Sequence, residues 1–109
     1  MRVGLLLAVV AAFVLSVSLT VSDAGAKRHS CKAVSVHFSG SGTFKYPVKV
    51  LKGSVSCGTA RTTLKHFIAK GSAPRGWTCF RGHGQDAWAA TCATGSAAHP
   101  RKEIRAYNP

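Results

Sequence analysis

The chain has 109 residues, of which 15 are Lys or Arg and only three are Asp or Glu, so its formal net charge is +12 at pH 7. This length fits one small domain and excludes a multidomain enzyme. A charge of this sign attracts polyanions, namely cell-wall polymers, nucleic acid or acidic lipid surfaces, and it does not choose among them. The alternative is that the charge only keeps the protein soluble.

The N-terminal segment predicts a secretory signal peptide over residues 1–26. Arg2 precedes an apolar run over 3–19, and the sequence AGA at 24–26 supplies an A-x-A cleavage site. An uncleaved membrane anchor is the alternative, because a run of about 18 apolar residues is near the minimum that spans a bilayer. We expect a secreted protein with a single domain over 27–109.

All four cysteines lie in 27–109: Cys31, Cys57, Cys79 and Cys92. An even number of cysteines in an exported chain predicts two disulfides, each contributing about 2–4 kcal/mol. A domain of this size needs them, because it buries only about 60–65% of the surface that its unfolded chain exposes. The spacings contain no C-x-x-C pair, so we expect neither a zinc site nor another cofactor.

The pairing of the cysteines has three possible forms. We favour Cys31 with Cys57, because a short turn before the helix would bring the start of the first strand near the helix N-terminus. This leaves Cys79 with Cys92. A tight hairpin over 83–85 would place Cys79 opposite Ala89, so that pairing requires a longer loop or a bulge. Cys57 with Cys79 remains the alternative.

Residues 56–71, SCGTARTTLKHFIAKG, predict the one helix. Its apolar residues fall on one stripe at helical spacing, and this stripe must face a core. Ser56 is a suitable N-cap, and Gly71 can adopt the left-handed conformation that ends a helix. The stripe consists of Cys57, Ala60, Leu64, Phe67 and Ile68.

Strands are predicted on both sides of the helix. After a basic, mobile lead over 27–30, alternation predicts a strand over 33–38 with Val34, Val36 and Phe38 inward. A flexible loop over 39–43 follows. The second strand should begin after Pro47, because proline is restricted to strand starts and edges.

Three further strands are expected over 76–81, 87–93 and 103–107. Trp77 and Cys79 should share one face of the first of these strands, Trp88, Ala90 and Cys92 one face of the second, and Ile104 and Ala106 should point inward from the last. The order of two strands, one helix and three strands predicts an α+β fold, a small, mostly antiparallel sheet with one amphipathic helix packed on one face, stabilised by disulfides.

The chain resembles a group of small exported four-cysteine proteins from actinomycete-type bacteria. Their pattern is a leading Cys with a strand, then V-x-C-x-x-A-R and an amphipathic helix, G-[FW]-x-C, and a later Cys before a terminal strand. The matching segments are CKAV at 31–34, VSCGTAR at 55–61, GWTC at 76–79, CATG at 92–95 and the strand over 104–107. In the group, basic residues directly follow the last Cys. In this chain they come after the loop over 94–100, at Arg101, Lys102 and Arg105. The resemblance implies a secreted, disulfide-linked α+β domain and no particular activity.

The outer face of the predicted helix carries Arg61, Lys65, His66 and Lys70. Like charges four residues apart mildly destabilise an isolated helix, and a polyanion lying across them would relieve the repulsion. This makes the helix face a candidate polyanion site, although a solvated face is the alternative. Residues that could extend the site are Arg101, Lys102 and Arg105, together with Lys45 and Lys49, with Tyr46 or Phe80 as aromatic platforms.

The sequence gives only weak evidence for a set of catalytic residues. Glu103, Arg105 and a histidine are the residue types of a small secreted ribonuclease, but ion pairing in solvent is the simpler role for Glu103. His83 and Asp86 could contact a metal or a substrate, yet a turn in which Asp86 bonds to its own backbone explains them better.

We therefore expect a secreted, non-enzymatic basic module that associates with anionic polymers, those of the cell envelope first. A protease inhibitor presenting the loop over 71–76 or 82–86 is the alternative, and a secreted ribonuclease is the second. No cofactor or metal is expected.

Overall fold

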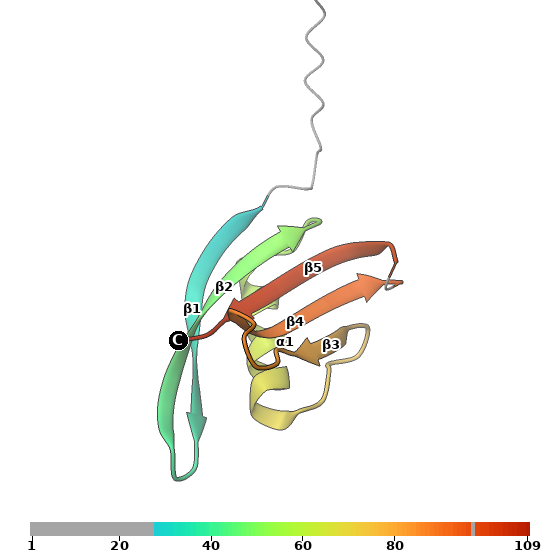
Figure 1. Cartoon of the computed structure of the whole chain (residues 1–109). Coiled ribbons are helices and arrows are strands. Elements are labelled where there is room, and N and C mark those ends of the chain that lie inside the picture. Colours follow the sequence, from blue (N-terminus) through green and yellow to red (C-terminus); the bar gives the residue numbers. More distant parts are fainter. Residues whose placement is uncertain (1–27, 97) are drawn as a thin grey trace, which may run out of the picture.

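The computed structural model describes residues 28–96 and 98–109, and the predicted signal peptide over 1–26 lies outside them. The described chain forms a five-stranded antiparallel sheet with one helix on one face (Figure 1). The predicted α+β class and element order are confirmed. The elements are β1 (His29–Phe38), β2 (Gly42–Lys52), α1 (Cys57–Lys70), β3 (Thr78–Arg81), β4 (Trp88–Gly95) and β5 (Pro100–Tyr107).

The last strand lies in the middle of the sheet. The strand order is β1-β2-β5-β4-β3, so β5 joins the β1–β2 pair to the β3–β4 pair. Ile104 and Ala106 on β5 are fully buried, as their alternation with polar neighbours predicts. β5 is also longer than expected, because it pairs with β4 along almost its whole length.

The helix begins and ends where the sequence predicts. The Ser56 hydroxyl oxygen accepts a hydrogen bond from the backbone N–H of Thr59 at 3.1 Å. At the other end Gly71 has φ 81°, and its N–H donates to the carbonyl oxygen of Phe67 at 2.8 Å. Both caps satisfy backbone groups that a helix terminus leaves without partners.

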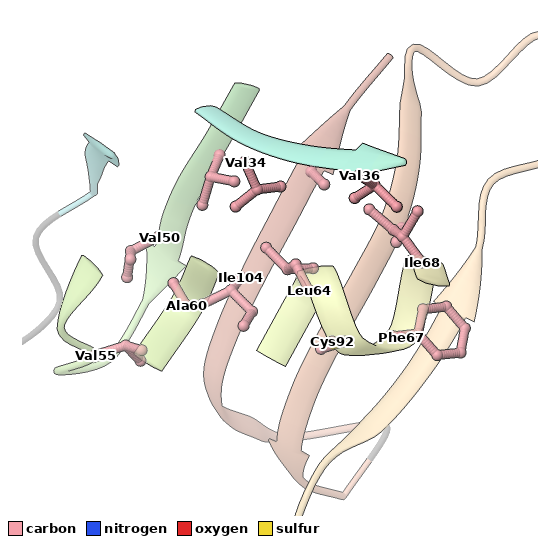
Figure 2. Close-up of a cluster of buried hydrophobic side chains, with 13 residues drawn as sticks. Val34, Val36, Val50, Val55, Ala60, Leu64, Phe67, Ile68, Cys92 and Ile104 are labelled. Carbon is pink, nitrogen blue, oxygen red and sulfur yellow. The ribbon is translucent and has the colours of Figure 1, made fainter. Parts of the chain in front are cut away.

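The core lies between α1 and the sheet (Figure 2). From the helix, Ala60, Leu64, Phe67 and Ile68 are buried, while Cys57 at the start of the stripe is half-buried. Thr63 is buried on the same side, which the apolar pattern did not predict. The sheet contributes Val34, Val36, Val48, Val50, Ala90, Cys92, Ile104 and Ala106.

Both favoured disulfides are present. Cys31–Cys57 joins β1 to the first turn of α1, and Cys79–Cys92 joins two residues that are directly opposite on β3 and β4. The second pairing is possible because the β3–β4 loop is longer than a tight hairpin: Arg81 lies opposite Ala90.

The prediction that the second strand begins after Pro47 is wrong. β2 begins at Gly42, and Pro47 lies inside it. β1 has a register shift between Cys31 and Val34 opposite Pro47, and the β5 pairing starts only at Val48. Pro47 therefore has no registered partner on either side, so its missing N–H removes no ladder hydrogen bond.

The first hairpin is also more regular than predicted. His29 and Ser30, expected in a mobile lead, belong to β1 and lie opposite Val50 and Lys49. The expected loop over 39–43 is shorter, because Thr43 lies opposite His37 and the turn closes through a hydrogen bond between residues 41 and 38.

The predicted orientation of Trp88 is wrong. Along β5 the partners of Trp88 and Ala90 are the adjacent residues Tyr107 and Ala106, so β4 has one extra residue between them. This β-bulge reverses the alternation of side chains. Ala90 and Cys92 face the helix, whereas the Trp88 ring lies on the opposite face, beside Arg105.

Replacement of Leu64 by Ala tests the core. Leu64 is fully buried between α1 and the sheet, so Leu64→Ala should lower the free energy of unfolding by about 2–5 kcal/mol. The exposed neighbour Thr62 provides the control, since Thr62→Ala should change it by less than about 0.5 kcal/mol. Urea denaturation of the oxidised protein measures both, and equal effects would contradict the described core.

Candidate functional site

The sheet face opposite α1, here called the helix-free face, carries a row of side chains that point away from the helix across all five strands, of which Thr91 is buried. Phe80 on β3 is opposite Thr91 on β4, Thr91 is opposite Arg105 on β5, Arg105 is opposite Lys49 on β2, and Lys49 is opposite Ser30 on β1. Each of the first four alternates along its strand with residues that face the helix or pack against the core. The register therefore brings an aromatic ring and two cations into one line.

Arg105 is held in place by three neighbours. Its guanidinium carbon lies 5.0 Å from the centroid of the Trp88 ring. Its Nε donates to the Thr91 hydroxyl oxygen at 2.9 Å, and its Nη2 lies 3.5 Å from the Glu103 carboxylate. These contacts leave Nη1 free of hydrogen-bond acceptors within the described part of the chain, so a fixed guanidinium can still donate to a ligand.

Lys49 has a similar aromatic support. Its Nζ lies 5.3 Å from the centroid of the Tyr107 ring, which is within the range of a cation–π interaction. A shallow depression of about 320 Å³ adjoins this pair, and Arg28 also lines it. The Arg105–Trp88 pair and the Lys49–Tyr107 pair are neighbours on this face. The two rings are on residues opposite each other on β4 and β5, and the two cations are on residues opposite each other on β5 and β2.

A groove of about 290 Å³ opens on the same face. We call it the Phe80 groove, since the Phe80 side chain, 55% exposed, is the most exposed large hydrophobic residue of those described. Thr91, Glu103 and Arg105 are among the polar residues that line it. The lining residues are Thr78, Phe80, Trp88, Thr91, Ala93, Gly95, Ser96, Pro100, Glu103 and Arg105.

The predicted polyanion residues do not form one patch. Lys65, His66 and Lys70 are exposed on α1, on the far side of the core from Arg105. Arg101 and Lys102 at the start of β5 line a separate depression beside Ser54, Gly76 and Thr94. Of the predicted set, the structure places only Arg105 in the Phe80 groove.

Arg61 supports the fold. Its Nε donates to the carbonyl oxygen of Lys32 and its Nη2 to that of Ala33, both at 3.1 Å. These two carbonyls belong to the irregular part of β1, between Cys31 and Val34, where the ladder is interrupted. The half-buried Arg61 thus binds backbone acceptors that the bulge leaves without a strand partner.

The positive charges are largely uncompensated. Arg2, Lys27 and Asp23 lie outside the described residues, which leaves 13 Lys and Arg against Asp86 and Glu103. Glu103 forms the single ion pair found in 28–96 and 98–109, with Arg105. Asp86 instead accepts a hydrogen bond from the backbone N–H of His83 at 2.8 Å, as the turn interpretation predicted.

Constellations for catalysis or metal binding are incomplete within the described chain. The Phe80 groove brings Glu103 and Arg105 together, but no histidine is among its described lining residues. The one described group of three metal-ligand types is His29, Cys31 and Cys57, and both sulfurs there are joined in the disulfide. A disulfide sulfur is not the thiolate that a metal requires, so this group offers one ligand atom at most.

Sequence reasoning missed Trp88, Thr91 and Tyr107 as members of the face. A signal for Tyr107 was present, because inward Ile104 and Ala106 require Glu103, Arg105 and Tyr107 to point outward. Trp88 had no such signal, since its orientation follows from the bulge.

The parts of the chain that the structure describes contain no helix with the length and hydropathy needed to cross a bilayer. No protein-family model, curated protein or solved structure matches this chain.

Substitutions of Arg61 and Lys65 on α1 test whether the first supports the fold and the second does not. Arg61→Ala removes two hydrogen bonds to β1 carbonyls and should lower the free energy of unfolding by about 1–3 kcal/mol. Lys65→Ala, one turn along at an exposed position, should change it by less than about 0.5 kcal/mol. Thermal and urea unfolding measure the difference, and an unchanged Arg61→Ala would contradict the supporting role.

Proposed function

We propose that this chain is an exported, non-enzymatic module that binds linear anionic polymers. The observation that carries the proposal is the uncompensated positive charge. The described residues include 13 Lys and Arg but only two carboxylates, and both carboxylates already accept contacts within the protein. A protein that needed charge only for solubility would not need cations fixed beside one another.

The helix-free face is the surface best suited to such a polymer. Arg105 and Lys49 lie opposite each other on adjacent strands, each over an aromatic ring. A side chain already held in one orientation loses less conformational entropy when it binds a ligand. The exposed cations of α1, Lys65 and Lys70, have no contact of this kind among the described residues and would add a weaker, diffuse attraction.

Two disulfides support the proposed location outside the cell, because such bonds persist in oxidising compartments. The signal peptide expected over 1–26 would direct the export of the chain. The expectation that the polymers belong to the cell envelope follows from export, because the net charge alone does not choose among polyanions.

Protein binding through the loop over 82–86 is the second candidate. The Cys79–Cys92 disulfide brackets this loop. Hydrogen bonds within it, and from Asn108 to the carbonyl oxygen of Asp86, hold it in shape. The loop is a closed turn instead of the extended segment that a substrate-like protease inhibitor presents, so this candidate ranks below polyanion binding.

Inorganic polyphosphate is a suitable probe, because it offers charge without rings. The oxidised protein should bind it, and the affinity should fall at least about tenfold between roughly 50 and 200 mM salt. The double variant Lys49→Gln/Arg105→Gln should weaken binding more than Lys65→Gln/Lys70→Gln, which removes the same charge from the helix.

Isothermal titration calorimetry gives the affinities, and circular dichroism confirms that both variants fold. No binding at low salt, or binding that salt leaves unchanged, would reject the proposal. Salt-insensitive capture of one protein from the medium of the producing cells would favour the second candidate.

A further inference from the structure

The Phe80 groove offers more than charge. We propose that it binds a base of single-stranded nucleic acid, with Arg105 and Lys49 binding the adjacent phosphates. This inference rests on the proposed polyanion binding and names the polymer class that the helix-free face accepts.

The size of the groove fits one small planar unit. Its volume of about 290 Å³ lies just below the range of small-molecule sites, roughly 300–1,000 Å³. The apolar walls come from Phe80, Trp88, Ala93 and Pro100. A flat ring can lie in such a groove with its polar edge toward Thr91 and Glu103.

Phe80 supplies a surface for stacking. More than half of its side chain is exposed, although its strand neighbour Cys79 packs against the core. Bases of single strands stack on aromatic side chains in this way, and such stacking tolerates any base because every base has a π-face. The guanidinium of Arg105, whose carbon lies 5.0 Å from the centroid of the Trp88 ring, offers a second planar group beside it.

Glu103 decides which polyanion fits. Glu103 lines the groove, and an ionised carboxylate can only accept hydrogen bonds. A polyuronate carries a carboxylate on every sugar ring, so a ring in the groove would bring two negative charges together. Nucleic acid separates the neutral base from the phosphate, and amino or imino groups of a base can donate to Glu103.

The row of side chains has the length for a short single strand. From Phe80 to Lys49 it crosses β3, β4, β5 and β2, a distance of about 14 Å at 4.7–4.9 Å between strands. Four-stranded sheets that recognise RNA stack two or three bases across a similar width. Duplex DNA cannot use this face in the same way, because its bases are stacked inside the helix.

A fluorescein-labelled oligo(dC) of about 12 nucleotides tests the inference by fluorescence anisotropy with the oxidised protein. An abasic oligonucleotide of equal length carries the same phosphates and should bind at least about fivefold more weakly. Phe80→Ala should weaken oligo(dC) binding roughly 5- to 100-fold and leave abasic binding unchanged, while Phe80→Tyr should retain the affinity.

Phe44→Ala is the matched control, because Phe44 is the other exposed large hydrophobic residue of the described chain and lies on the β1–β2 hairpin, away from the groove. It should leave both affinities unchanged. Glu103→Gln should raise the affinity for polygalacturonate, since the repulsion in the groove disappears.

Three results would overturn the inference, and they are distinguishable. Equal affinity for abasic and base-bearing strands would show that the groove holds no base, while polyanion binding itself would stand. Tight polygalacturonate binding that depends on Phe80 would assign the groove to an acidic polysaccharide. If neither oligonucleotide, polygalacturonate nor polyphosphate binds, the proposed function fails as well.

Discussion

The packing of α1 on a single face of the sheet is the constraint on which the rest of this structure depends. Leu64 and Ile68 bury the sheet residues beneath them, and the strand alternation then sends every second side chain to the other face. The described chain has no second helix to cover that face. A small domain with one core layer is marginally stable, so the disulfides at the start of α1 and between β3 and β4 offset the missing burial.

Two of the register irregularities in the sheet, one in β1 and one in β4, give two arginines different tasks. The irregularity in β1 leaves backbone carbonyls without strand partners, and the fork of Arg61 reaches two of them at once. The bulge in β4 turns Trp88 outward, where its ring supports Arg105. Lysine could replace neither residue well, because only a planar guanidinium combines several donors with a face that stacks. The bulges thus supply the partners of these two arginines, backbone carbonyls for Arg61 and an aromatic ring for Arg105.

The helix-free face combines general attraction with local selectivity. Its cations act over roughly a Debye length, about 10 Å at 0.1 M salt, and would draw in any polyanion. Glu103 lies within this positive surface and pairs with Arg105 at 3.5 Å. A carboxylate among cations lowers the general attraction slightly, but it excludes a charged ring from the Phe80 groove. This division of roles is the physical basis for the polymer class that we propose.

The sequence by itself determined the elements whose signals are local. The apolar stripe with Ser56 and Gly71 defined α1, alternation identified the inward residues of β1 and β5, and the cysteine spacing with short connections favoured the pairing that is present. Only the tertiary structure decided that Pro47 lies within β2, that Trp88 faces away from the core and that the predicted cations divide between two faces. The first two features depend on bulges in the β1–β2 and β4–β5 pairings, which the period-two pattern of the sequence does not reveal, and a one-residue shift there reverses the face of every following side chain. The division of the cations depends on which face of the sheet the helix covers.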